Sequence, residues 1–203
     1  MKYTDDYINQ IIQGDCLEVI PNIPDKSIDM IFTSPPFKEE DVKGNYWEEY
    51  DKWFFEMNRV CKKVIIIIHS ATKLNHLIKA YPPKRLIIWG KGYSQCAYRF
   101  NPILLYQMND DYKINKYIWA DVFGVQSVQG KKKEHKYQDP LILYETIIKM
   151  FKGCKIVCDP FAGSGTTGVA CINLKRNYIL IEKESKYVEI ARNRIKAMPE
   201  SLF

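Results

Sequence analysis

The chain has 203 residues, of which 46% are hydrophobic, and this suits one globular catalytic domain, 1–203, with a sizeable core. Its 30 Lys and Arg residues exceed 24 Asp and Glu residues, so the formal charge of +6 permits an anionic partner such as nucleic acid without requiring one. No run approaches the roughly 18 apolar residues of a membrane span, and the start has no charged segment followed by an apolar one. We therefore expect a cytosolic protein with no membrane partner.

Apolar runs of strand length alternate along the chain with stretches of helical period. This alternation is typical of an α/β domain with a mostly parallel sheet and helices on both faces. Seven strands are predicted at 8–13, 28–32, 64–69, 86–89, 103–107, 155–158 and 178–181. Helices are predicted at 50–62, 71–79, 140–151, 166–174 and 186–197.

Two segments interrupt the alternation, the polar stretch 38–47 and the longer stretch 109–138, which mixes aromatic residues, Gly and a basic run. In doubly wound folds, excursions at strand ends are where ligands are bound.

The six cysteines lie in apolar surroundings, form no CxxC pair and are accompanied by only three histidines. We expect free buried thiols and no metal site. The six are Cys16, Cys61, Cys96, Cys154, Cys158 and Cys171.

A glycine-rich turn follows the predicted strand 155–158 and leads into a helix. Gly163 and Gly165 allow backbone to approach a ligand closely, and Thr166 and Thr167 are expected to cap the helix. The sequence GSGTTG lacks the Lys of a phosphate-binding P-loop, which argues against a nucleoside triphosphate.

About twenty residues after Gly163, Glu182 follows the next strand, where a carboxylate can accept both hydroxyls of a ribose. Together the turn and the carboxylate indicate an adenosine-containing cofactor. The alternative is a glycine turn and an exposed Glu that only close a strand-helix junction.

A second motif, Ser34-Pro35-Pro36-Phe37, directly follows the predicted strand 28–32. The two prolines hold an extended backbone, so the Ser34 hydroxyl and the Pro35 carbonyl can act as acceptors for both hydrogens of an exocyclic amino group. Phe37 would stack on a base extruded from a duplex. None of the cysteines stands in a Pro-Cys nucleophile motif, so no covalent intermediate is expected. The alternative is a turn with a buried Phe.

With both motifs in view, the chain resembles the amino-group DNA methyltransferases of bacteria and phages, in their permuted β group. In that family a (D/N/S)PP(Y/F/W) motif precedes the cofactor motif DPFxGSGTT, as Ser34–Phe37 precedes Asp159–Thr167 here. The stretches IIQGDCLEVIPNIPDKSIDMIFTSPPF and DPFAGSGTTGVACINLKRNYILIEKESKYVEIARNRI extend the likeness over most of the chain.

The resemblance implies a circularly permuted Rossmann-like methyltransferase fold, S-adenosyl-L-methionine as cofactor, and DNA with a flipped target base as substrate. It implies that Ser34, Pro35, Pro36 and Phe37 are catalytic. By the same likeness, Asp159, Phe161, Gly163 and Gly165 line the methionine part of the cofactor, Glu182 its ribose and Asp15 its adenine amino group. The other implied cofactor-binding residues are Ser164, Thr166 and Thr167.

Two departures from the family stand out. In the stretch 135–140, HKYQDP, Asp139 replaces the Lys of the family's His-x-x-Gln-Lys-Pro, which puts that cofactor contact in doubt. The stretch 59–64 lacks the family's glycine turn, and we expect this to alter a loop.

The variable stretch 92–138 is a candidate short target-recognition insertion, because basic and aromatic residues can contact phosphates and stack on bases. About half of it looks like sheet instead, with a strand at 101–107 whose aromatic residues belong equally well to the core. The run Lys131–Lys133 is interpreted as a solvated loop that also contacts phosphate. The shortness of this stretch favours a short target or a homodimer, which the family likeness makes plausible.

Ser at the first motif position is the usual choice of the family's N4-cytosine enzymes, whereas N6-adenine enzymes more often have Asp or Asn. Either amino group fits the chemistry, so cytosine is favoured and adenine is kept as the alternative. RNA and protein amino methyltransferases can share such a motif, but they usually have the glycine motif first, so the order seen here argues against them.

A non-catalytic DNA- and cofactor-binding partner subunit is an alternative of another class.

Overall fold

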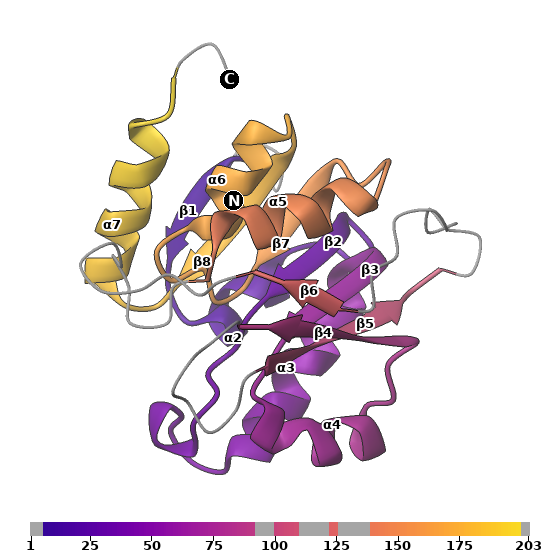
Figure 1. The fold of residues 1–203 in the computed structure, drawn as a ribbon. Helices are drawn as coiled ribbons and strands as arrows, with labels where there is room; N and C mark the ends of the chain where they lie inside the picture. The colour runs from indigo at the N-terminus through magenta and orange to yellow at the C-terminus, as the bar shows by residue number, and fades with distance from the viewer. Residues whose placement is uncertain (1–5, 92–99, 110–121, 126–138, 200–203) are drawn as a thin grey trace.

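The structure, a computed structural model, describes residues 6–91, 100–109, 122–125 and 139–199. These residues form one eight-stranded sheet in the order β1-β8-β7-β2-β3-β5-β4-β6 (Figure 1). Only β5 runs antiparallel to its neighbours, β3 and β4. The strands are β1 (Gln10–Gln13), β2 (Ile28–Thr33), β3 (Cys61–Ile68), β4 (Arg85–Gly90), β5 (Phe100–Gln107), β6 (Val122–Gly124), β7 (Ile156–Asp159) and β8 (Asn177–Glu182).

The mostly parallel α/β sheet and its seven predicted strands are confirmed, but the sheet has an eighth strand, β6, that was not predicted. It has only three residues and pairs with the edge of β4, so it carries too little hydrophobic periodicity to be recognised. The first predicted strand begins two residues later than expected, because Asn9 has a φ of 59° and ends a turn there.

The five predicted helices are confirmed with small changes in their bounds. The helices are α2 (Cys16–Val19), α3 (Tyr46–Val60), α4 (Leu74–Ala80), α5 (Leu141–Met150), α6 (Thr166–Asn173) and α7 (Ser185–Lys196), with 3-10 turns η1 (Ile20–Asn22), η2 (Glu39–Asp41) and η3 (Ala71–Lys73). The short helix α2 was not predicted.

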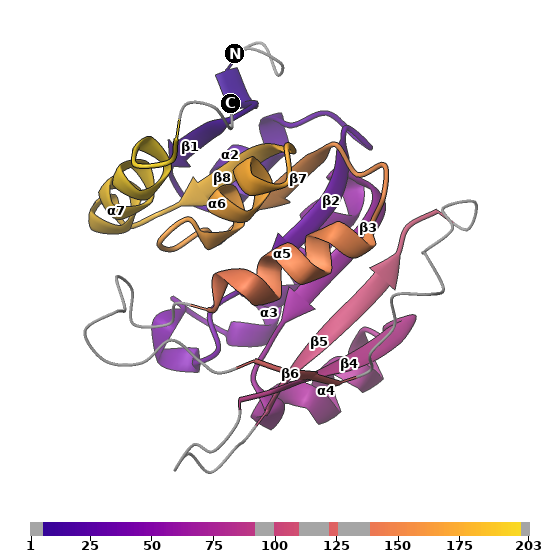
Figure 2. The same ribbon diagram turned by 45° about the horizontal axis from the view of Figure 1, so that its top comes forward.

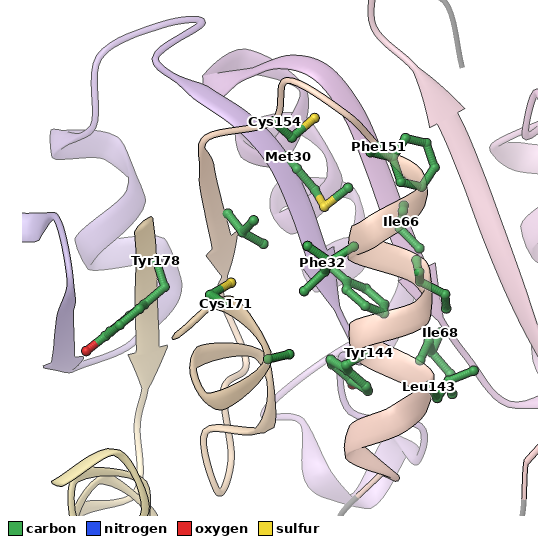
Figure 3. Packing of buried hydrophobic residues seen from close by; sticks show 14 of the residues in the cluster. Met30, Phe32, Ile66, Ile68, Leu143, Tyr144, Phe151, Cys154, Cys171 and Tyr178 are labelled. Atoms are coloured by element: carbon green, nitrogen blue, oxygen red, sulfur yellow. The ribbon is translucent and has the colours of Figure 1, made fainter. Parts of the chain in front are cut away.

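Helices cover both faces of the sheet. Helices α5 and α6, with Ile195 of α7, pack on one face, and α2, α3 and α4 pack on the other (Figures 1 and 2). The central strands contribute side chains to the cores on both faces, because successive side chains of a strand point to opposite sides of the sheet. In β2, Met30 and Phe32 face α5, as Figure 3 shows, whereas Ile31 belongs to the core under α3.

Helix α3 begins four residues earlier than predicted, because the Asn45 side chain accepts hydrogen bonds from the Trp47 and Glu48 amides and caps it. In the stretch 59–64, which lacks the family's glycine turn, α3 ends at Val60 and β3 begins at Cys61 with no loop between them. Arg59 secures this junction, donating to the carbonyls of Ile20 and Ile23.

Five of the six cysteines are free and buried, as predicted, and Cys96 lies outside the described residues. Within the described ranges, no three His, Cys, Asp or Glu side chains gather in a way that could hold a metal ion. In the same part of the chain, none of the helices combines the length and apolarity needed to cross a membrane.

Candidate active site

The residues predicted to act together come from the carboxyl ends of neighbouring parallel strands. Asp15 follows β1, Glu182 ends β8, Asp159 ends β7 and Ser34 follows β2, and these four strands are adjacent in this order. Strands lie about 4.8 Å apart, so the line from β1 to β2 spans roughly 14 Å. Open α/β sheets bind ligands at this edge.

The Asp159 carboxylate joins the two sequence motifs. Its Oδ1 accepts from the Thr33 hydroxyl at 2.7 Å and from the Phe161 amide at 3.1 Å, and its Oδ2 accepts from the Thr167 hydroxyl. Burial raises the pKa of Asp159 to about 6, although these hydrogen bonds favour the charged form. The last residue before the Ser-Pro-Pro-Phe motif is therefore bonded to the first residue of the glycine motif.

Helix α7 packs against the glycine turn. Gly163 and Gly165 have φ values of 51° and 77°, which suit glycine. A Cβ on Gly165 would stand 2.8 Å from the Ala191 Cβ, so this glycine also permits close packing of the turn against α7.

Arg194 of α7 completes this support, donating to the Ser164 carbonyl at 2.7 Å, the Ser164 hydroxyl at 2.9 Å and the Thr166 hydroxyl at 3.2 Å. The side chains of Ser164, Thr166 and Thr167 are all buried.

The expected capping of α6 by Thr166 and Thr167 was wrong. The N-cap of α6 is Gly165, with no side-chain cap, because Thr167 is bonded to Asp159 and Thr166 accepts from Arg194. The Thr167 hydroxyl thus donates to a buried carboxylate, whereas the Ser164 and Thr166 hydroxyls accept from Arg194 and keep their own hydrogen to donate.

Two half-buried carboxylates flank the turn. Glu182 accepts from the Gly163 amide through Oε2 and from the Glu184 amide through Oε1, both at 2.8 Å. Burial raises the pKa of Glu182 against the effect of these amides. Asp15 caps α2 through the Leu17 amide and pairs with Lys183 at 2.8 Å. Burial opposes ionisation of Asp15, but the hydrogen bonds from Lys183 and Leu17 outweigh it and lower the pKa.

The Ser-Pro-Pro-Phe loop leaves β2 beside β3. Ser34, Pro36 and Phe37 are partly exposed and Pro35 is buried. The Tyr46 hydroxyl donates to the Pro36 carbonyl at 2.7 Å, and the Phe37 ring stacks on His69 with centroids 5.2 Å apart. Phe161, the other aromatic residue predicted here, packs edge-on against Trp53 of α3 at 4.9 Å.

Five residues that support the site were not selected from the sequence, namely Thr33, Tyr46, Trp53, His69 and Arg194. Each contacts a group elsewhere along the chain, from 10 positions away for Tyr46 and Pro36 to 126 for Thr33 and Asp159, and each occurs within an ordinary helix or strand pattern. Thr33 was the one with a local signal, because a polar residue ends an apolar strand directly before the motif.

Comparison with known proteins identifies the family. The family model for N6 and N4 methyltransferases, whose description is DNA methylase, matches residues 28–193 of this chain, and these residues include both motifs. The chain belongs to this DNA methylase family. It is an S-adenosyl-L-methionine-dependent methyltransferase of an amino group in DNA, either N4 of cytosine or N6 of adenine.

The methylase is 30% identical to the type II methyltransferase M2.MboI of Moraxella bovis, over 94% of this chain and 89% of that protein. It is 29% identical to the type II methyltransferase M.HinfI of Haemophilus influenzae, over 94% of this chain and 69% of that protein. Among solved structures it is similar to M1.HpyAVI in complex with SAM, with 26% identity, a TM-score of 0.70, and 91% and 98% of the two chains covered.

The residues at this edge of the sheet fit S-adenosyl-L-methionine. The half-buried Asp15 and Glu182 offer carboxylate acceptors for an amino group and for ribose hydroxyls, and the backbone at Gly163 lies beside Glu182.

Asp139, which replaces the Lys of the family motif, accepts from the buried Tyr144 hydroxyl at 3.1 Å, and Tyr144 stacks on Phe32 of β2. Residues 135–138 of that motif lie outside the described residues.

Proposed function

We propose that this methylase transfers a methyl group to the N4 amino group of cytosine in DNA, with Ser34, Pro35, Pro36 and Phe37 as its catalytic residues. The observation that carries this proposal is the order of groups along the carboxyl edge. Asp15, Glu182 and the glycine turn would hold adenine, ribose and methionine in sequence, and Ser34 is next in line. The Thr33–Asp159 bond joins the Ser-Pro-Pro-Phe loop to the glycine motif, which supports a target site beside the methionine end.

When bound, S-adenosyl-L-methionine supplies an electrophilic methyl group on a sulfonium sulfur. The lone pair of the target amino group is delocalised into the ring, which makes its nitrogen a weak nucleophile. The Ser34 hydroxyl and the Pro35 carbonyl accept its two hydrogens and favour a tetrahedral nitrogen whose lone pair faces the methyl group. The N–C bond would form as the bond between the methyl group and sulfur breaks, and the same two acceptors would stabilise the positive charge on the nitrogen. That nitrogen would then release one of its two hydrogens as a proton to solvent, which leaves a neutral methylamino group.

No cysteine nucleophile takes part in this proposal. The described cysteines are buried, and burial raises the pKa of the Cys158 thiol, the one beside Asp159, far above its ordinary value. The Phe37 ring, partly exposed at the end of the motif, is the surface on which the flipped base would stack.

The choice of cytosine rests on Ser34 at the first motif position. A neutral hydroxyl acts as an acceptor towards an amino hydrogen and keeps the site free of an added charge.

The M2.MboI and M.HinfI relatives come from bacteria, which supports the expected origin in the cytoplasm of a bacterium or a phage-infected cell.

We propose that the stretch 92–138 recognises the target sequence. Three parts of it lie outside the described residues: 92–99, 110–121 and 126–138, the last of which contains Lys131–Lys133. Its described part includes β5, whose residues 101–106 are buried in the sheet, so these residues do not face DNA. The alignment with M.HinfI extends over 251 positions, more than this chain has residues, so that relative carries segments that this chain lacks. A small recognition region of this kind supports the proposal of a homodimer on DNA.

The test is digestion to nucleosides of plasmid DNA treated with the purified protein and labelled cofactor, with N4-methylcytosine and N6-methyladenine as standards. Labelled N4-methylcytosine is the expected product. Labelled N6-methyladenine would overturn the base assignment and leave the site intact. DNA binding without label transfer, on single and double strands, would favour a non-catalytic partner subunit.

A further inference from the structure

His69 and Tyr46 form a hydrogen-bonded chain that ends on the catalytic loop. His69 directly follows β3, whose Ile67 pairs with Thr33 of β2, and its side chain is fully buried. The Ser70 amide donates to His69 Nδ1 at 2.7 Å. His69 Nε2 lies 2.8 Å from the Tyr46 hydroxyl, which in turn lies 2.7 Å from the Pro36 carbonyl oxygen.

These contacts determine where the protons are. The Ser70 amide can only donate, so Nδ1 of His69 must be the acceptor and a neutral ring carries its proton on Nε2. The Pro36 carbonyl can only accept, so the Tyr46 hydroxyl donates to it and accepts from Nε2. Every group in the chain is then satisfied, with one direction of donation from Ser70 to Pro36.

A neutral His69 agrees with its surroundings. Burial lowers its pKa to about 3, and the positive charge of Lys73 acts in the same direction. Lys73 Nζ lies 4.6 Å from the centre of the Tyr46 ring and pairs with Glu39. A protonated His69 would direct an N–H at the Ser70 amide, which offers no acceptor.

The His69 ring has a second contact with the loop. It stacks on Phe37 at 5.2 Å with an interplanar angle of 25°, so one face of the Phe37 ring is occupied by His69. A base can then stack only on the opposite face. His69 thus holds both the last proline of the motif, through Tyr46, and the aromatic ring that follows it.

We infer that His69 and Tyr46 are positioning residues that preorganise the Ser34–Phe37 loop for the transition state. This inference rests on the proposed role of that loop in methyl transfer. Neither residue touches the cofactor residues named above, so their loss should lower kcat and leave the affinity for S-adenosyl-L-methionine unchanged.

Tyr46→Phe removes the hydroxyl alone, and its matched control is Tyr50→Phe. Tyr50 lies one turn later on α3, is equally buried, and its hydroxyl has no hydrogen-bond partner among the described residues. We expect Tyr46→Phe to lower kcat by about 10-fold, on the scale of one neutral hydrogen bond, and Tyr50→Phe to retain the wild-type kcat.

His69→Phe keeps a stacking ring and removes the donor. If the chain acts as a unit, His69→Phe in the Tyr46→Phe background should add little to the loss of kcat, because the hydrogen bond to Pro36 is already gone. Equal kcat for Tyr46→Phe and Tyr50→Phe, or additive losses in the double variant, would overturn the inference.

A second measurement does not depend on activity. The protein has three histidines, so imidazole ¹⁵N spectra of the wild type and of His69→Phe identify the His69 signals. We expect the neutral tautomer with the proton on Nε2, and a changed Nε2 shift in Tyr46→Phe but not in Tyr50→Phe. A proton on Nδ1 would contradict the chain. Absence of methyl transfer by the wild type, with these spectra as expected, would instead overturn the proposed function.

Discussion

The Thr33 hydroxyl donates a 2.7 Å hydrogen bond to the Asp159 carboxylate, and both side chains are buried. These residues are 126 positions apart in the chain, yet they end neighbouring parallel strands, β2 and β7. The bond therefore joins the Ser-Pro-Pro-Phe loop to the glycine motif.

Removal of this bond should cost both stability and activity. Thr33→Val keeps the shape of the side chain but removes one of the two donors to Asp159 Oδ1, and a hydrogen bond to a charged group contributes about 1.5–3 kcal/mol. Thr33→Ser retains the hydroxyl and is the control. Urea unfolding would measure the loss, and equal free energies of unfolding for Thr33→Val and Thr33→Ser would show that the bond has no net effect.

The raised pKa of Asp159 predicts a specific pH dependence of stability. The folded pKa of about 6 lies above the unfolded value near 3.9, so the folded state binds more protons between these values. The contribution of Asp159 to stability is therefore full below about pH 4 and is lost as the pH rises through 6.

The measurement for Asp159 is the difference in free energy of unfolding between wild type and Asp159→Asn from pH 4 to pH 7. The wild type should lose up to roughly 3 kcal/mol relative to the variant across this range. Asp15 and Asp29, whose pKa values are lowered, give the opposite trend in both proteins and cancel in the difference. A difference that stays constant with pH would contradict the raised pKa.

Ser34→Ala removes the proposed acceptor for an amino hydrogen. We expect kcat to fall about 10²-fold to 10³-fold, the effect of deleting one preorganised hydrogen-bonding group, while cofactor affinity stays within a few fold. Ser27→Ala, in the turn before β2, is the control. Transfer of labelled methyl groups and calorimetric titration with cofactor measure the two quantities. Full activity in Ser34→Ala would exclude the acceptor role.

Gly165→Ala tests the glycine turn, with Gly153→Ala as a control for backbone strain alone. Both glycines have positive φ, 77° and 84°, but a Cβ on Gly153 meets nothing within 4 Å. Gly153→Ala should cost about 1–2 kcal/mol of stability. Gly165→Ala should cost about 1–3 kcal/mol more, because its Cβ collides with Ala191, and it should also abolish cofactor binding. Equal losses of stability would mean that the turn can move away from α7.

Arg194→Met should weaken cofactor binding, because it removes the Nη1 donor that contacts Ser164 and Thr166. Arg192→Met is the control, since Arg192 lies on the same helix and makes a 3.3 Å exposed contact with the Ile11 carbonyl. Titration with cofactor would show the difference, and equal affinities would remove Arg194 from the support of the turn.

The sequence by itself determined the α/β alternation, the two motifs and their order, because strand and helix periods and short motifs are local properties. Contacts between distant elements were decided only by the tertiary structure. Sheet order placed Thr33 beside Asp159, and helix packing brought Tyr46 to Pro36 and Arg194 to the glycine turn. The hydroxyl of Thr167 shows the difference: beside a helix start it indicated a cap, but a buried carboxylate from the adjoining strand offered the stronger partner.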